Sequence, residues 1–304
     1  MADHVVVGAG PVGSAVARLL AEDGQRVRVV SESGGGPEHP LIECRAGDAS
    51  DASQLTELTR GAKVLYNCVN LPLTSWTAEL PALSAATIAA ARAHDAVLAI
   101  TGNLYVYGPR PDGRMDENTP LAATSRKGRV RVDMWRDALA ADIDTFEVRG
   151  SDYIGADAFS VLGVRLLPAL ARGRAAWIPA NVDLPHTWTY VGDVARTLVV
   201  LAGDPRARGR AWHVPSSPDV SIRDMAARFA RAAGREPVPL HGIPETGLRV
   251  AGLFSPMARE TREIAYKFYA PFRLDSTLTE RTFGLAATDL EEAIREQVAA
   301  SPLL

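Results

Sequence analysis

The stretch of sequence that sets the fold reads Val5-Val6-Val7-Gly8-Ala9-Gly10-Pro11-Val12-Gly13. Its valines predict a strand buried in a parallel sheet, because β-branched residues pack well on a pleated surface. A helix is expected from Ser14 to Glu22 and a second strand over residues 27–30. Strand, glycine-rich turn, helix and strand within about 30 residues form the βαβ unit that binds dinucleotides at the helix N-terminus. We therefore expect a cofactor site at Gly8, Gly10, Pro11, Val12 and Gly13; the alternative is a glycine-rich turn without a ligand.

Helical and strand patterns alternate along most of the chain. The helical patterns cover residues 53–61, 81–94 and 125–141, and buried strands are expected at 63–68, 96–101 and 145–149. Strands separated by helices predict an α/β fold with a Rossmann-type doubly wound parallel sheet. Frequent prolines and short helices after about Gly155 predict a smaller C-terminal substrate domain. The predicted dinucleotide-binding domain comprises residues 1–155 and 184–203, and the substrate domain comprises 156–183 and 204–304.

The composition excludes several classes of protein. The 304 residues are 47% hydrophobic and 23% charged, which suits a sizeable core and argues against disorder. With 33 basic and 36 acidic residues the net charge is −3, so we expect no nucleic-acid partner and no membrane. No run approaches the ~20 apolar residues of a spanning helix. Two cysteines cannot form a disulfide scaffold and the six histidines lack ligand spacing, so we expect a cytoplasmic protein without a metal site.

The residue at the tip of the second strand bears on the choice of cofactor. A carboxylate there binds the adenosine ribose of NAD and repels the extra phosphate of NADP. This chain has Ser31 followed by Glu32, with Arg45 as a more distant phosphate partner. A serine hydroxyl can donate to a phosphate, so the sequence slightly favours NADP(H) over NAD(H). The opening also resembles that of flavin-dependent monooxygenases, but we find no second FAD-contacting motif.

Several motifs occur in a characteristic order along the chain. They are Gly47-Asp48-Ala49-Ser50-Asp51, Asn67-Cys68-Val69, Tyr105-Val106-Tyr107-Gly108-Pro109, Asp116-Glu117-Asn118-Thr119-Pro120, Arg149 to Gly155, and Tyr190-Val191-Gly192-Asp193-Val194-Ala195. With these motifs the chain resembles the extended short-chain dehydrogenase/reductases, a superfamily of sugar epimerases, dehydratases and ketoreductases. The resemblance implies a nicotinamide cofactor that is also contacted by Asp48, Ala49, Asn67, Cys68, Val69 and Ser151.

The catalytic positions depart from the family pattern. The family has Ser or Thr four residues before the Tyr-Gly pair and Tyr-x-x-x-Lys on the following helix; here those positions hold Asn103, Lys127 and Arg131. The chain thus resembles the atypical members that lack the usual triad. Asn103 can donate a hydrogen bond to a carbonyl oxygen but cannot supply a proton.

Two residues are candidate proton donors. Tyr105 lies two residues after Asn103, and Lys127 would lose a proton more easily beside the positive charge of Arg131, one turn later. The alternatives are a packed aromatic side chain for Tyr105 and a solvated charge for Lys127. A hydroxyl of the substrate, or water, is a third source of the proton.

The remaining substrate contacts are expected at Asp152, Tyr153 and His186. Our main hypothesis is an NAD(P)H-dependent ketoreductase with a non-standard site, acting on a small aromatic or polyketide-like metabolite. One alternative is a sugar-nucleotide epimerase or dehydratase, although the missing Tyr-x-x-x-Lys pair counts against it. Another is a catalytically inactive NADP-binding redox sensor. The resemblance also implies a homodimer formed through residues 81–94 and 125–141, but the arginine-rich second helix disfavours that pairing.

Overall fold

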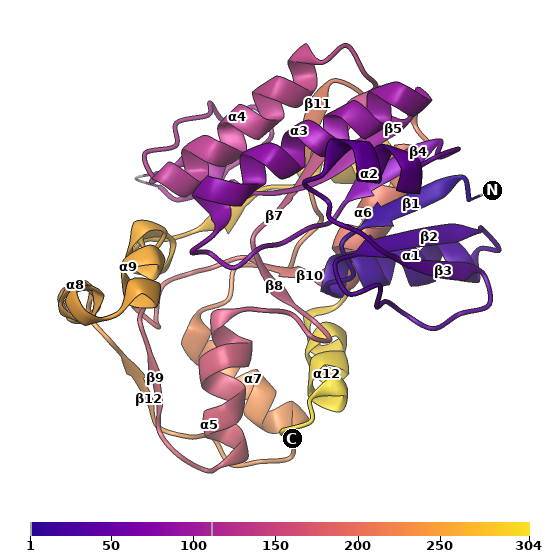
Figure 1. The fold of residues 1–304 in the computed structure, drawn as a ribbon. Helices are drawn as coiled ribbons and strands as arrows, with labels where there is room; N and C mark the ends of the chain where they lie inside the picture. The colour runs from indigo at the N-terminus through magenta and orange to yellow at the C-terminus, as the bar shows by residue number, and fades with distance from the viewer. Residues whose placement is uncertain (1, 111) are drawn as a thin grey trace.

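The computed structural model describes residues 2–110 and 112–304 and contains one large parallel sheet (Figure 1). Its strand order is β11-β7-β5-β4-β1-β2-β3, and every neighbouring pair is parallel. The strands are β1 (His4–Val7), β2 (Val27–Ser31), β3 (Ile42–Ala46), β4 (Val64–Asn67), β5 (Val97–Asn103), β7 (Thr145–Gly150) and β11 (Arg210–His213). The order reverses between β1 and β4, and a crevice that can hold a ligand forms at the carboxyl ends of the strands at such a switch point. The predicted doubly wound sheet is confirmed.

Helices cover both faces of this sheet (Figure 1). On one face α1 (Pro11–Glu22) and α6 (Val191–Ala202) bury Val16, Leu20 and Leu198 in a common core. On the other face lie α2 (Ala52–Leu58), α3 (Trp76–His94) and α4 (Arg126–Ala140). The valines of β1 are completely buried between the two layers, which explains why the run at residues 5–7 has no polar member.

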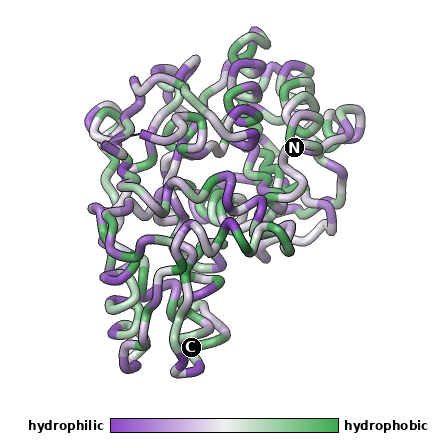
Figure 2. The backbone as a smooth tube through the Cα atoms, turned by 90° about the vertical axis from the view of Figure 1, so that its left-hand side faces the viewer, coloured by the Kyte–Doolittle hydropathy of each residue, from purple (hydrophilic) through white to green (hydrophobic). Residues whose placement is uncertain are grey.

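A smaller lobe with its own apolar core forms the narrower lower part of the molecule in Figure 2, where the chain also ends. Its strands are β8 (Asp152–Ile154), β9 (Ala176–Ile178), β10 (Trp188–Tyr190) and β12 (Leu240–Gly242). Its helices are the π-helix η2 (Leu162–Leu166), α5 (Leu167–Ala171), α7 (Ile222–Ala232), α8 (Glu245–Phe254), α9 (Pro256–Glu263), α10 (Tyr266–Tyr269) and α12 (Leu290–Ala300). Because separate apolar cores lie in the two lobes, the chain has a two-lobed architecture.

Part of the segment 204–304, which the sequence assigned to the substrate domain, belongs to the large sheet. Strand β11 lies beyond residue 203, yet it forms the edge of the large sheet beside β7. Helix α11 (Thr277–Phe283) returns to this edge, where Phe283 packs edge-on against Trp212 of β11. The short pair β6 (Arg114–Met115) and β13 (Arg273–Leu274) also joins the segment after β5 to the C-terminal region. Two short 3₁₀ turns, η1 (Leu104–Tyr107) and η3 (Pro205–Ala207), complete the described elements.

Within residues 2–110 and 112–304, no helix combines the length and apolar character needed to cross a bilayer. The same residues contain no group of three or more His, Cys, Asp or Glu side chains arranged to hold a metal ion.

Candidate active site

The glycine turn after β1 has the geometry of a phosphate cradle. A Cβ on Gly13 would lie 1.9 Å from the Gly8 carbonyl oxygen, and Gly8 itself has φ +101° and sits against the backbone of Cys68. By contrast, nothing lies within 4 Å of the place where a Cβ on Gly10 would be. Helix α1 begins at Pro11 without a side-chain cap and without an acidic residue in its first turn. Its first amides are therefore free of side-chain acceptors and can hold a pyrophosphate.

The ends of β4 and β5 form the wall beside this turn. Asn67 is buried, and its Oδ1 accepts a hydrogen bond from the Val69 amide at 3.3 Å. The buried Cys68 thiol accepts a hydrogen bond from the Thr101 hydroxyl at 3.6 Å. Burial raises the pKa of Cys68 to about 12, so the thiol stays protonated and is no nucleophile. Asn67 therefore lies at the carboxyl end of β4, and Cys68 follows it against Gly8.

The polar groups at the expected adenosine end are already engaged within the chain. The Ser31 hydroxyl donates to the Gly35 carbonyl at 2.7 Å, so its only proton is not available to a phosphate. Asp48 accepts hydrogen bonds from the hydroxyl and amide of Ser50, and these lower its pKa. Arg45 donates to the carboxylate of Glu43 at 2.8 Å. Ala49 packs beside the α2–α3 core. The geometry thus offers no unpaired cation for the extra phosphate of NADP among these residues.

Asn103 serves the turn that follows β5. Its Oδ1 accepts a hydrogen bond from the Tyr105 amide at 3.0 Å, which caps the 3₁₀ turn η1. This cap holds the Tyr105 backbone at the carboxyl edge of the sheet, where the ring lies 5.9 Å from that of Trp76. Asn103 therefore fixes the backbone of Tyr105, a role that the sequence pattern does not indicate.

Lys127, a candidate proton donor, forms ion pairs with α9 instead. The side chain is completely buried, so it is not a solvated charge either. Its ammonium binds the carboxylates of Glu260 and Glu263 on α9, the latter at 3.0 Å. The ammonium is therefore engaged in two ion pairs with α9. The family register correctly placed Lys127 on α4, but it could not predict that α9 packs over it.

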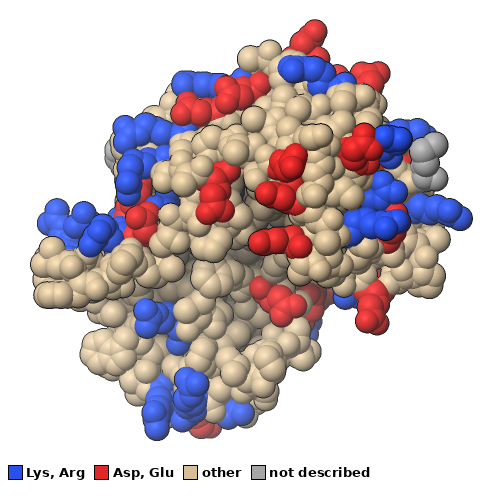
Figure 3. Space-filling model, in the orientation of Figure 1, with Lys and Arg blue, Asp and Glu red and all other residues tan. Residues whose placement is uncertain are grey.

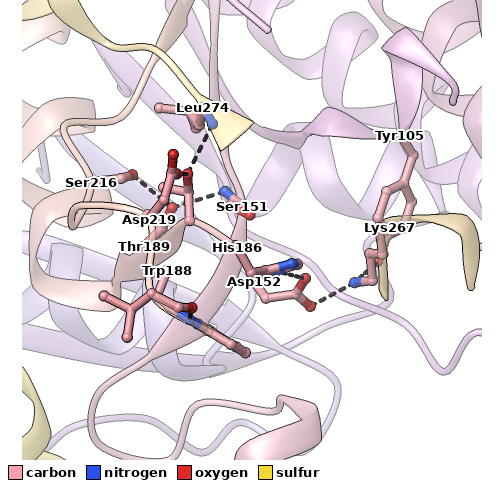
Figure 4. Close-up of polar contacts among 12 residues, drawn as sticks. Tyr105, Ser151, Asp152, His186, Trp188, Thr189, Ser216, Asp219, Lys267 and Leu274 are labelled. Atoms are coloured by element: carbon pink, nitrogen blue, oxygen red, sulfur yellow. Dashed lines mark hydrogen bonds and ion pairs between the residues drawn. The ribbon is translucent and has the colours of Figure 1, made fainter. Parts of the chain in front are cut away.

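Tyr105 instead meets a lysine from the C-terminal lobe (Figure 4). The ammonium of Lys267, on α10, donates to the Tyr105 hydroxyl at 2.9 Å and to Asp152 Oδ1 at 2.6 Å. The other oxygen of Asp152 lies 2.9 Å from His186 Nε2. Asp152 and His186, both expected near the substrate, are thus joined to Tyr105 through Lys267, a residue that sequence reasoning missed. One signal was available: Lys267 is one of only three lysines and stands among the aromatic residues Tyr266-Lys267-Phe268-Tyr269.

The charges in this group are strongly coupled. Burial opposes ionisation of Asp152, but Lys267 and His186 outweigh it and hold the pKa of the carboxyl well below its usual range. Burial likewise opposes the charge on Lys267, but Asp152 and Tyr105 outweigh it and raise the pKa of the ammonium. The side chains therefore form an ion pair with almost no net charge.

Buried polar atoms without partners lie at the same edge of the sheet. Arg131, 6% exposed, donates to the Thr101 carbonyl at 3.3 Å and stacks 4.6 Å from the Trp76 ring centre, but its Nε has no partner. The Ser151 hydroxyl is also buried without a partner, and Ser151 follows Gly150, which pairs with Asn103. Buried polar groups are almost always hydrogen-bonded, so these two atoms are available to a ligand bound at this edge.

Aromatic side chains surround the group. Tyr153 lies against Gly150, with its hydroxyl 3.5 Å from the Gly102 carbonyl. His186 stacks on Phe268 and Phe272 at centroid distances of 5.2 and 5.4 Å. On the surface, acidic side chains gather around a hollow near the middle of the face shown in Figure 3, and most basic side chains lie toward its edges.

No known family model and no curated protein matches this chain. Solved structures match it along nearly its full length. The enzyme WbmH of Bordetella bronchiseptica in complex with NAD+ has a TM-score of 0.77 at 19% identity, covering 99% of this chain and 98% of that one. UDP-glucose 4-epimerase of Thermotoga maritima has 0.79 at 14% identity, covering 98% of each chain. The dTDP-glucose 4,6-dehydratase DesIV of Streptomyces venezuelae, with NAD bound, has 0.80 at 16% identity, covering 98% and 96%. At these identities the likeness establishes that the chain has the fold of NAD-binding epimerases and dehydratases.

Proposed function

We propose that this protein is a nicotinamide-dinucleotide-dependent oxidoreductase that acts on a small carbonyl compound at Tyr105. The observation that carries the proposal is the pair of buried, unpartnered groups, Arg131 Nε and Ser151 Oγ, at the same sheet edge as an uncapped, glycine-lined helix N-terminus. Hydroxyl and amide acceptors of a nicotinamide riboside would satisfy both groups. The fit at both ends supports a dinucleotide lying across the carboxyl edge of the sheet.

The charges at the adenosine end lead us to propose NAD(H) over the NADP(H) that the sequence slightly favoured. Ser31 donates its proton to Gly35, and Arg45 is paired with Glu43, a carboxylate that Arg28 also contacts. A 2′-phosphate placed here would have no unpaired cation among the residues expected to hold it, whereas ribose hydroxyls need none. NADH should therefore bind more tightly than NADPH.

The chemistry that we propose is reduction of a ketone. The cofactor, when bound, supplies hydride. Tyr105 donates a proton to the carbonyl oxygen. Among the hydrogen bonds of the described residues, its hydroxyl is the only tyrosine hydroxyl that contacts a lysine ammonium, and this cation can stabilise the phenolate that is left. Asn103 holds Tyr105 in place through its amide. A small aromatic or polyketide-like ketone fits the aromatic walls and the neutral balance of Lys267 and Asp152.

A sugar-nucleotide epimerase or dehydratase is the second candidate. It is favoured by the likeness to solved epimerases and dehydratases over nearly the whole chain. The charge balance disfavours it, because the Lys267 ammonium is already neutralised by Asp152 and leaves less attraction for a diphosphate. A binding protein that holds the dinucleotide without reducing a substrate is a third reading, and it predicts that Tyr105 is dispensable.

The test combines NADH titration calorimetry with reduction of α-tetralone, a bicyclic aromatic ketone, and turnover of UDP-glucose. We expect saturable NADH binding, ketone reduction, and loss of about 100-fold or more in kcat in Tyr105→Phe with unchanged NADH affinity. Tyr269→Phe is the matched control, since that hydroxyl donates to the Ile243 carbonyl and should be dispensable. Absence of NADH binding would overturn the proposal, and turnover of UDP-glucose without ketone reduction would favour the second candidate.

A further inference from the structure

Lys267 and Tyr105 come from parts of the chain 162 residues apart, yet the ammonium and the phenol are in direct contact at 2.9 Å. We propose that Lys267 is the positioning residue that stabilises the phenolate of Tyr105 during proton transfer, with Asp152 and His186 holding the ammonium in place. The inference rests on the proposed function. It assigns to two segments far apart in sequence the work that a tyrosine and a lysine on one helix do in the family that this chain resembles.

The position of Lys267 suits it to stabilise negative charge on the Tyr105 oxygen. Its side chain is 5% exposed, and the ammonium lies 5.0 Å from the centre of the Tyr105 ring and 4.7 Å from that of Phe268. Because so little of the side chain reaches solvent, the charge is balanced mainly by the groups that it touches, which are Asp152 and the Tyr105 oxygen. Negative charge that develops on that oxygen is stabilised by a charge-assisted hydrogen bond.

Asp152 and His186 fix the direction of the ammonium. Each carboxylate oxygen of Asp152 has its own partner, Lys267 at 2.6 Å and His186 at 2.9 Å, so the carboxylate cannot rotate freely. The imidazole itself stacks on the rings of Phe268 and Phe272. Loss of His186 should therefore loosen Asp152 and act on Tyr105 only indirectly.

The proton and electron balance is complete without a further reagent. As hydride reaches the carbonyl carbon, the carbonyl oxygen takes the proton of the Tyr105 hydroxyl, and the phenolate remains beside the Lys267 ammonium. The phenolate recovers a proton from water after the alcohol leaves. The net change is ketone, reduced dinucleotide and one proton to alcohol and oxidised dinucleotide.

Other titratable groups also face Tyr105 and must be considered in any pH experiment. Tyr153 of β8, Tyr266 of α10 and Arg131 of α4 all interact with it electrostatically, besides Lys267 and Asp152. Burial raises the pKa of both Tyr153 and Tyr266, so they remain neutral through the neutral and mildly alkaline range. Arginine keeps its charge throughout. Lys267 and Asp152 are therefore the groups whose removal should change the titration of Tyr105.

The decisive experiment follows phenolate absorbance during alkaline titration of the protein without cofactor or substrate. The absorbance of Tyr105 is obtained by subtracting the titration curve of the Tyr105→Phe variant from that of the protein that retains Tyr105. This subtraction is made once with wild-type Lys267 and once with Lys267→Met. We expect the phenol of Tyr105 to ionise less readily in Lys267→Met, which has lost the ammonium beside it, and Lys267→Arg to restore most of the effect. Lys127→Met removes a buried lysine elsewhere and should leave the midpoint unchanged. Equal midpoints with and without Lys267 would overturn the proposal.

The kinetic arm separates this proposal from the proposed function. Lys267→Met should lower kcat for α-tetralone about tenfold or more without raising KM for NADH, and its alkaline limb should move to higher pH. If wild-type protein does not bind NADH, the proposed function fails while the titration still tests the Tyr105–Lys267 pair. If Lys267→Met fails to fold, Asp152→Asn provides the same comparison with the lysine still present, and it should shift the Tyr105 midpoint in the opposite direction.

Discussion

Replacing Lys127 by methionine distinguishes a structural role for this residue from a catalytic one. Methionine keeps most of the side-chain length but leaves the carboxylates of Glu260 and Glu263 without their buried cation. Removing one partner of a buried ion pair costs about 3–5 kcal/mol. The two glutamates retain 19% and 14% exposure, so water lowers the expected cost to about 2–3 kcal/mol. The melting temperature should fall by about 4–8 °C.

Arg126→Met is the matched control for this measurement. Arg126 faces the same two glutamates at 3.6 and 3.4 Å but is 62% exposed, so its loss should cost less than about 1 kcal/mol. Urea unfolding gives both values, and NADH calorimetry should show no loss of affinity in either variant. The reasoning is refuted if the two variants are equally stable, or if Lys127→Met keeps wild-type stability and loses catalysis.

The same ion pairs predict a dependence on pH. Burial acts against the charge of Glu263, but the hydrogen bonds from Lys127 outweigh it and lower the pKa of this carboxyl. A lowered carboxyl pKa stabilises the fold above the usual glutamate range, and this contribution is lost as the pH falls. The difference in stability between wild type and Lys127→Met should therefore shrink in acid.

Three further outcomes are expected. Gly13→Ala would place a Cβ 1.9 Å from the Gly8 oxygen, and strain of about 1–3 kcal/mol should weaken NADH binding about tenfold or more, measured by calorimetry. Arg131→Met should weaken NADH binding about tenfold yet leave the melting temperature unchanged or higher, because it removes a poorly paired buried charge; lower stability with full affinity would contradict this. Burial lowers the pKa of His213 from 6.5 to about 4, so the imidazole is neutral in the folded protein at pH values where it is charged in the unfolded chain. Urea unfolding should therefore show a loss of up to about 3 kcal/mol in the free energy of unfolding as the pH falls from 6.5 to 4. The loss should be smaller in His213→Gln.

The sheet and its cofactor edge could be predicted because their signals are local. The valines of β1 and the glycines that follow specify a buried strand and a close turn within a few residues, and the structure places Gly8, Gly13, Asn67 and Cys68 side by side. The strand order then follows from the short connections of a doubly wound sheet.

The proton-transfer group could not be predicted in the same way, because it depends on the path of the C-terminal lobe. Asp152 and His186 were recognised separately, but their connection runs through Lys267, whose position depends on how α8, α9 and α10 return to the sheet. For Lys127 the position along the chain could be predicted, but its contacts could not. Its place on α4 followed from the register of a motif, while its partners on α9 are more than 130 residues away and leave no local signal.

A crystal structure of the protein grown with NADH tests the central claim most directly. Electron density for the pyrophosphate should lie on the Val12 and Gly13 amides, with the nicotinamide beside Tyr105 and its ribose within hydrogen-bonding distance of Arg131. A dinucleotide bound elsewhere, or a nicotinamide turned away from Tyr105 with Arg131 still unpaired, would contradict it.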